Sequence, residues 1–214
     1  MITVGSAEIS STPIHRDSDR LTYVSEDEDK PLIIGPMTDR SGDELAERYG
    51  YTDLERLSTS LPSDSEILDV GAGLSNLGHM IASRRPDIQW TNLDIRYSPG
   101  RIHPITETTL ENLKFTAPDN VRYVAGNVLE LPREIAAKRY AHIFSYYMIH
   151  HVSNNGREFG VQAIRNMLQL GEPGGKLSVG PVNFSLYSTH TVIIPETPEA
   201  VEALAAQVTG RLIE

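Results

Sequence analysis

The chain has 214 residues, 39% of them apolar, and a formal net charge of −10 from 19 Lys and Arg against 29 Asp and Glu. This size suits one core and one domain, at the ~100 to 200 residues usual per domain. The acidic balance disfavours nucleic acid as a partner, because it repels phosphate backbones. Cysteine is absent, which excludes disulfides, thiolate metal sites and cysteine nucleophiles.

The opening stretch lacks the basic region and apolar run of a signal peptide, and no segment reaches the ~18 apolar residues of a membrane-spanning helix. We therefore expect a soluble, cytoplasmic protein with no membrane partner. Residues 1–40 are polar and include an acidic run at 26–29, which predicts a solvated loop or arm. Ser41 is a plausible N-cap for two short helices that precede the core.

From residue 66 onward, short β-rich apolar runs alternate with helical segments. The expected strands begin with EILDVGAG at 66–73 and continue at 89–95, 121–126, 142–149 and 176–182. Candidate helices follow the first strand at 77–85 and lie at 104–114, 132–139 and 158–169. In the tail, 189–195 is a candidate sixth strand, 197–210 a helix, and 211–214 a segment that closes the sheet.

Such alternation predicts an α/β fold, a Rossmann-like three-layer sandwich with a mainly parallel central sheet and helices on both faces. Ligands of such sheets bind at the carboxyl ends of the strands. We divide the chain into residues 1–60, an N-terminal arm with short helices and a candidate lid, and residues 61–214, the core domain.

The strongest motif is the turn after the first strand, where Asp69 is followed by Gly71, Ala72 and Gly73. Glycines at a strand-to-helix turn permit tight dihedral angles and a close approach of ligand to backbone. A dinucleotide fingerprint needs a third small residue at position 76, where this chain has Asn76, and pyrophosphate gains little from a neighbouring acid. NAD is therefore disfavoured.

A cationic, phosphate-free cofactor with an amino-acid end has a use for the carboxylate of Asp69. Its ribose has a use for a second carboxylate at the end of the next strand. Asp94 stands there, 21 residues after Gly73, close to the ~20-residue spacing expected for an acid that meets ribose hydroxyls.

These stretches, EILDVGAGLSNLG and TNLDIR, resemble the first two motifs of the class I S-adenosylmethionine-dependent methyltransferases, and the resemblance covers roughly residues 60 to 182. It implies S-adenosylmethionine as the cofactor. In that family the glycine turn, here Gly71, Ala72 and Gly73, approaches the methionine and ribose portions. Asp94 would bind both ribose hydroxyls, and Ile95 would pack against adenine.

VRYVAGNVLELP at 121–132 resembles the third-strand motif of the family, which places Gly126, Asn127 and Val128 near the adenine. The residue after the glycine is usually acidic and bonds the adenine amino group. Asn127 stands there in this chain, and an amide accepts that bond more weakly.

YAHIFSYYMIHHV at 140–152 resembles the fourth-strand motif, with Ala141 in place of the usual Asp. Ser145 and Tyr146 would border the sulfonium and the incoming nucleophile. His151 matches a recurrent histidine of the family and is our candidate general base, with a pocket-shaping hydrogen-bonding role equally open.

No metal is expected, because the histidine doublet lacks carboxylates at ligand spacing. Tyr49 and Tyr51 have two interpretations: they close over the cofactor as an aromatic lid that excludes water, or they pack in ordinary helix contacts.

The resemblance implies methyl transfer, and the missing motifs narrow the acceptor to an O or N atom of a small molecule. The fourth strand lacks the Pro-Pro-aromatic motif of amino-methylating nucleic-acid enzymes, and the glutamate-rich loop of protein arginine methyltransferases is not apparent. Three alternatives remain: a cofactor-binding pseudoenzyme that serves as a partner subunit, an enzyme using the cofactor for other chemistry, and an NAD-dependent oxidoreductase. The acceptor's identity, the atom methylated and the oligomeric state are left open.

Overall fold

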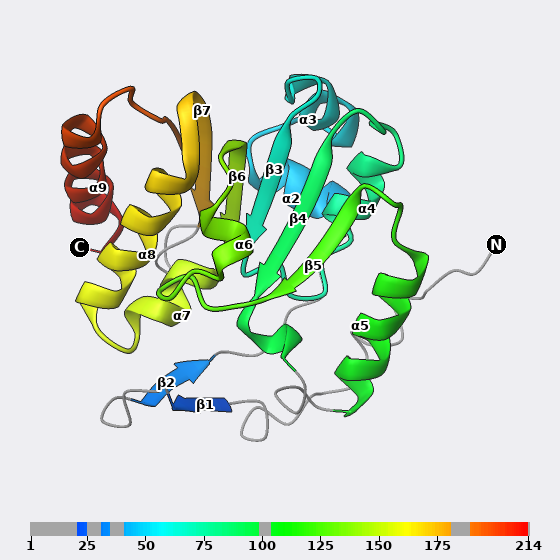
Figure 1. Cartoon of the computed structure of the whole chain (residues 1–214), viewed down its shortest axis with the longest axis horizontal. Helices are drawn as coiled ribbons and strands as arrows, with labels where there is room; N and C mark the ends of the chain where they lie inside the picture. The colour runs from blue at the N-terminus through cyan, green and yellow to red at the C-terminus, as the bar shows by residue number, and fades with distance from the viewer. Residues whose placement is uncertain (1–20, 25–30, 35–40, 99–103, 181–188, 214) are drawn as a thin grey trace.

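The computed structural model describes residues 21–24, 31–34, 41–98, 104–180 and 189–213. A six-stranded sheet runs through the centre of the molecule in the order β5-β4-β3-β6-β7-β8 (Figure 1). All neighbouring strands pair in parallel except β7 and β8, which are antiparallel. The strands are β3 (Glu66–Val70), β4 (Gln89–Asp94), β5 (Val121–Ala125), β6 (Tyr140–Tyr146), β7 (Gly171–Gly180) and β8 (His190–Ile193).

Helices cover both faces of this sheet and bury a separate apolar core on each. One core lies beneath α2 (Gly42–Arg48), α3 (Leu54–Ser60) and α4 (Leu77–Ala82) and includes Ile67 and Trp90. The other lies beneath α6 (Arg133–Ala136), α7 (Met148–Ser153), α8 (Arg157–Leu170) and α9 (Pro198–Ile213) and includes Leu68 and Ile143. Successive strand residues thus point to opposite faces, which confirms the expected Rossmann-like three-layer sandwich.

The strand order reverses beside β3, because the chain runs from β3 through β4 to β5 on one side and then crosses back to β6 on the other side. In an open parallel sheet, such a reversal of strand order marks the place where ligands bind. The short helix η1 (Ile95–Tyr97) continues directly from β4, and α5 (Pro104–Thr116) leads to the edge strand β5. The carboxyl ends of β3, β4 and β5 therefore lie together at one edge of the sheet (Figure 1).

Most of the predicted elements are confirmed, including both short helices after Ser41, whose hydroxyl accepts a hydrogen bond from the Glu44 N–H at 3.1 Å. The predicted strand at 142–149 was wrong at its end. It stops at Tyr146 because Tyr147 adopts a left-handed conformation with φ 66°, and α7 follows. The predicted closing strand at 211–214 was also wrong, since α9 continues to Ile213.

Residues 1–40 were expected to form a loop or arm, but they contain an antiparallel hairpin of β1 (Leu21–Val24) and β2 (Pro31–Ile34). Two four-residue strands are too short to give a sustained period in a polar segment. Strand β2 contacts α7, and the hairpin lies at the edge of the sheet where β3 and β4 end (Figure 1). The acidic run at 26–29 and residues 181–182 of the fifth predicted strand lie outside the described residues.

None of the helices in the described ranges is long and apolar enough to cross a bilayer.

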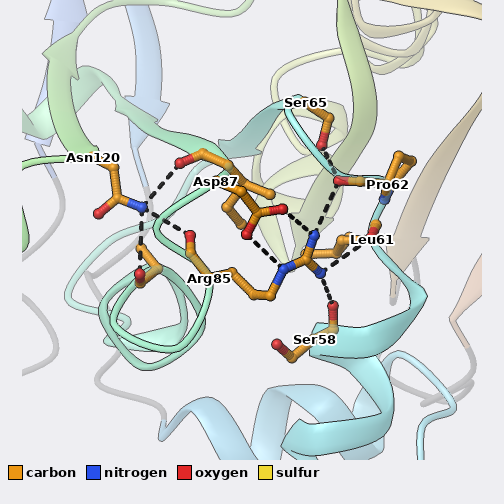
Figure 2. Close-up of polar contacts among 9 residues, drawn as sticks. Ser58, Leu61, Pro62, Ser65, Arg85, Asp87 and Asn120 are labelled. Carbon is orange, nitrogen blue, oxygen red and sulfur yellow. Dashed lines mark hydrogen bonds and ion pairs between the residues drawn. The ribbon is translucent and has the colours of Figure 1, made fainter.

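The side chain of Arg85 fastens α3 and the turn that follows it to the rest of the domain (Figure 2). Its guanidinium donates to the carbonyl oxygens of Ser58 at 2.6 Å, Leu61 at 3.2 Å and Pro62 at 3.4 Å. It also makes a two-pronged ion pair with Asp87, at 2.8 and 2.6 Å. One planar group thus satisfies three carbonyl groups near the end of a helix, as only arginine can.

Replacing this guanidinium should destabilise the fold. We expect Arg85→Ala to lower the free energy of unfolding by about 1.5 to 3 kcal/mol, the usual value for hydrogen bonds to a charged group. Urea denaturation followed by circular dichroism measures the change. The neighbouring Arg84 is exposed, so Arg84→Ala is the matched control and should stay within about 0.5 kcal/mol of the parent protein. Equal losses in both variants would contradict this role of Arg85.

Candidate functional site

The glycine turn after β3 has the backbone geometry that the sequence predicts. Gly71 and Gly73 have φ values of 73° and 57°, in the left-handed region that favours glycine. A Cβ atom added at Gly71 would lie 2.5 Å from the Cβ of Met148, at the start of α7. The Gly71 N–H donates to the carbonyl of Leu93 at 2.7 Å. The turn is thus held between the ends of two neighbouring elements, and Ala72 is buried within it.

The carboxylate of Asp94 joins the end of β4 to this turn. Its Oδ2 accepts a hydrogen bond from the N–H of Gly73 at 2.9 Å, and its Oδ1 accepts one from the N–H of Arg96 at 2.8 Å. Desolvation raises the Asp94 pKa, whereas the two backbone hydrogen bonds oppose that rise. The hydroxyl of Tyr97 donates to the carbonyl of Gly73 at 2.8 Å, which adds a third link.

Asp69 is the second carboxylate of the site, and its surroundings differ. Its side chain is buried, and burial together with the nearby charge of Asp94 raises its pKa to about 7. Within the described ranges, no hydrogen bond to its carboxylate oxygens is found. This pair of carboxyl groups therefore makes the turn a place that favours a cationic group and repels phosphate.

The residues expected near the adenine lie directly after β5. Gly126 donates its N–H to the carbonyl of Asp94 at 3.2 Å, so it lies beside the ribose-binding candidate. The Oδ1 of Asn127 accepts the N–H of Leu129 at 3.0 Å, and Val128 is buried. The Asn127 oxygen already closes a local turn, which leaves it one lone pair for a ligand.

Three expected residues lie at the end of β6 and in the helix that follows. Ser145 and Tyr146 are both buried. The N–H of Tyr147 donates to the carbonyl of Gly180 at 2.6 Å, which holds the left-handed turn in place. His151 lies half-buried in α7, and burial, followed by the charges of His150 and Arg96, lowers its pKa to about 4. Its imidazole is therefore neutral at physiological pH.

The remaining predicted residues take different positions. Ile95 is half-buried in η1, next to Asp94. Tyr49 packs edge-on against Phe144 and Tyr146, with ring centroids 4.8 and 5.9 Å away, which supports the helix-packing interpretation. Tyr51 is half-buried beside the same core.

Sequence reasoning missed Tyr97, Met148 and Asn92, which contact or flank the turn. TNLDIR and SYYM contain or border all three, but no spacing rule singled them out. No group of three or more potential metal-ligating side chains is found in the described part of the chain.

No protein-family model matches the chain, and no curated protein does either. Solved structures with a similar fold include the N-methyltransferase NodS from Bradyrhizobium japonicum WM9, in complex with S-adenosyl-L-homocysteine. The two chains are 20% identical with a TM-score of 0.48, over 75% of this chain and 72% of that one.

Two further similar structures are matched over a smaller share of their own chains. TrmN from Thermus thermophilus is 18% identical with a TM-score of 0.45, over 59% of this chain and 35% of that one. PKMT2 from Rickettsia typhi, solved with AdoHcy, is 21% identical with a TM-score of 0.44, over 62% and 25%. All three structures are under 25% identical to this chain and have TM-scores below 0.5, so the assignment of the site rests on the geometry of this chain.

Gly71 should be intolerant of a side chain for two separable reasons. Gly71→Ala places a Cβ both at positive φ and against Met148, whereas Gly50→Ala meets the same backbone strain, at φ 85°, with nothing within 4 Å. We expect Gly50→Ala to cost ~1 to 2 kcal/mol of unfolding free energy and Gly71→Ala a further ~1 to 3 kcal/mol from overpacking. Thermal and urea unfolding measure both. Equal losses of unfolding free energy in the two variants would show that the contact with Met148 adds no destabilisation.

The lowered pKa of His151 links the stability of the fold to pH. Because the folded value, about 4, lies below the ordinary 6.5, the unfolded chain binds a proton here that the folded chain does not. Stability should therefore fall as pH decreases from 6.5 to 4, and His151→Gln should remove this contribution, up to ~1.4 kcal/mol per pH unit. Urea unfolding of both proteins across this range is the measurement. Parallel stability curves would contradict the shift.

Proposed function

We propose that the chain binds S-adenosylmethionine at the carboxyl ends of β3, β4 and β5 and transfers its methyl group to an O or N atom of a small molecule. The observation that carries the proposal is the carboxylate of Asp94, held by the N–H groups of Gly73 and Arg96. Each carboxylate oxygen accepts one of these bonds and keeps further lone-pair capacity. Two adjacent ribose hydroxyls are the natural partners for two such oxygens.

The charges at the turn support this cofactor over a dinucleotide. A pyrophosphate placed against the Gly71 backbone would meet the Asp69 and Asp94 carboxyl groups. S-Adenosylmethionine instead presents an ammonium and a sulfonium, which both carboxylates attract. The positive φ at Gly71 and Gly73 allows the ligand to approach the backbone without side-chain obstruction. When bound, the cofactor supplies an activated methyl group.

The residues of this chain contribute mainly by positioning. Methyl transfer needs the nucleophile and the methyl carbon aligned in a dry pocket, and such alignment alone supplies a large part of the rate. Neutral His151 accepts a hydrogen bond from an O–H or N–H of the acceptor. Its low pKa makes it a weak base, so we assign it to orienting the acceptor. It would receive the acceptor's proton only as the acceptor atom bonds to the methyl group and its O–H or N–H becomes acidic. The net charge of −10 favours neutral or cationic acceptors.

Asp94→Ala tests the ribose contact. Loss of charge-assisted hydrogen bonds should cost ~1.5 to 3 kcal/mol, so the dissociation constant for S-adenosylhomocysteine should rise by roughly 10- to 150-fold. Isothermal titration calorimetry measures it, with circular dichroism to verify the fold. Asp119 is exposed and precedes β5, so it lies at the amino end of that strand, away from the site at the carboxyl ends. Asp119→Ala is therefore the control of equal charge and should bind the ligand as the parent protein does. An unchanged constant in a folded Asp94→Ala protein would refute the assignment.

The parent protein should bind S-adenosylmethionine and S-adenosylhomocysteine but not NAD in parallel titrations. Selective binding of NAD would overturn the proposal. Methyl transfer itself is tested with a panel of small amines and phenols, by following formation of S-adenosylhomocysteine. Binding without turnover on any acceptor, together with a second protein that copurifies, would favour the partner-subunit alternative.

A further inference from the structure

Three tyrosine rings lie together where β6 ends and α7 begins. The rings of Tyr146 and Tyr147 have centroids 5.0 Å apart and planes at 75° to each other. Tyr49, at the end of α2, contacts Tyr146 as well, at 5.9 Å and 77°. Tyr49 and Tyr146 are buried, whereas Tyr147 is half-buried, so part of that residue is accessible. We call the nearly perpendicular rings of Tyr146 and Tyr147 the aromatic corner.

The backbone of Tyr147 creates this corner. Successive residues of a strand point to opposite faces, so Tyr147 would point away from Tyr146 if β6 continued. Instead Tyr147 has φ 66° and ψ −16°, a left-handed conformation that is rare for a bulky side chain. Its ring thereby joins Tyr146 beside the core beneath α2 and α4. Bulky residues held in such a conformation cluster at functional sites, because glycine would adopt it without strain.

The aromatic corner lies beside the glycine turn and its negative charges. Met148 follows Tyr147 directly, and a Cβ atom on Gly71 would lie 2.5 Å from the Cβ of Met148. Neighbouring Cα atoms are ~3.8 Å apart, so the corner begins one residue away from the contact with the turn. Asp69 and Asp94 lie at the ends of the next two strands. The positive charge of Arg96 acts on His151 but also on Asp94, which offsets it.

We propose that the aromatic corner binds the nitrogen of an amine acceptor and that Tyr147 selects amines over neutral molecules of the same shape. The inference rests on the proposed function for the methyl transfer. The face of a tyrosine ring attracts a cation within about 6 Å of its centroid, and two nearly perpendicular rings offer a cation two contacts. Carboxyl groups on the neighbouring strands add to this attraction.

The chemistry of the transfer favours the same class of acceptor. The amine nitrogen bonds to the methyl carbon with its own lone pair, while the carbon–sulfur bond breaks and its electron pair stays on sulfur. Positive charge therefore develops on the nitrogen, where the aromatic corner stabilises it. A tertiary amine has no proton to lose, and a primary or secondary amine loses one to water afterwards. A hydroxyl acceptor needs a base during the step, and burial lowers the pKa of His151 to about 4, which makes it a weak one.

Two probes of equal shape isolate the charge. Choline and 3,3-dimethyl-1-butanol share three methyl groups and a hydroxyl, but choline has a positively charged nitrogen where the alcohol has a carbon. We expect the parent protein, saturated with S-adenosylhomocysteine, to bind choline roughly 5- to 10-fold more tightly than the alcohol. Ligand-detected NMR titration measures both constants. S-Adenosylhomocysteine has no methyl group to transfer, so binding is observed without turnover.

Variants of Tyr147 assign the preference to its ring. Tyr147→Ala should bring the two dissociation constants within about twofold of each other, whereas Tyr147→Phe should keep most of the preference because the ring remains. Phe115 is 90% exposed near the end of α5, towards the amino end of β5, so Phe115→Ala is the control that removes a distant aromatic ring. It should keep the full preference for choline.

A comparison of glycine with alanine tests the backbone that creates the corner. Tyr147→Gly and Tyr147→Ala remove the same ring, and glycine is ordinarily the less stable of the two residues. At positive φ this order reverses. We therefore expect the melting temperature of Tyr147→Gly to lie about 2 to 4 °C above that of Tyr147→Ala. The opposite order would remove the left-handed turn, and with it the aromatic corner.

The outcomes separate this inference from the proposed function. A parent protein that binds S-adenosylhomocysteine but shows no preference for choline overturns the inference and leaves the proposed function standing. A preference that survives in Tyr147→Ala overturns it equally. A parent protein that does not bind S-adenosylhomocysteine overturns the proposed function and the inference with it.

Discussion

The hydrogen bonds from the backbone of Gly73 and Arg96 to the Asp94 carboxylate are the constraint on which the candidate site depends. They fix the glycine turn after β3 to the end of β4, and the Tyr97 hydroxyl reinforces the same joint. They restrict a turn whose two glycines, at positive φ, have little conformational preference of their own. The proposed function gives this carboxylate a ligand-binding role beside its structural one, which an acceptor with two oxygens and several lone pairs permits.

The fold could be predicted from the sequence because its determinants are local. Buried parallel strands give short apolar runs, the intervening helices give amphipathic spacing, and together they imply one topology class. The proximity of Asp94 to the glycine turn could be predicted for the same reason. The spacing between Gly73 and Asp94 is the length of chain that a helix and a second strand need. The end of β6 was missed because one residue in the left-handed conformation, Tyr147, stops the strand inside an apolar run that has no glycine or proline to signal it.

The aromatic corner could not be predicted for the same reason that the end of β6 was missed. Tyr146 and Tyr147 are neighbours in the chain, and the alternation of a strand would send one of the two rings to the opposite face. In the sequence, both are ordinary residues of an apolar run. Only the observed left-handed turn brings the two rings together.

The two sides of the site are coupled through one packing contact. Met148 begins α7 directly after the left-handed turn at Tyr147, and it lies where a Cβ on Gly71 would be. The same helix carries His151, so close packing of Gly71 against Met148 sets the distance between the glycine turn and His151. Because Gly71 also donates a hydrogen bond to Leu93, near the end of β4, a displacement of α7 would strain the contact between the glycine turn and β4. The in-line displacement of the proposed function requires rigid alignment of donor and acceptor, and packing imposed by the sheet topology would supply it.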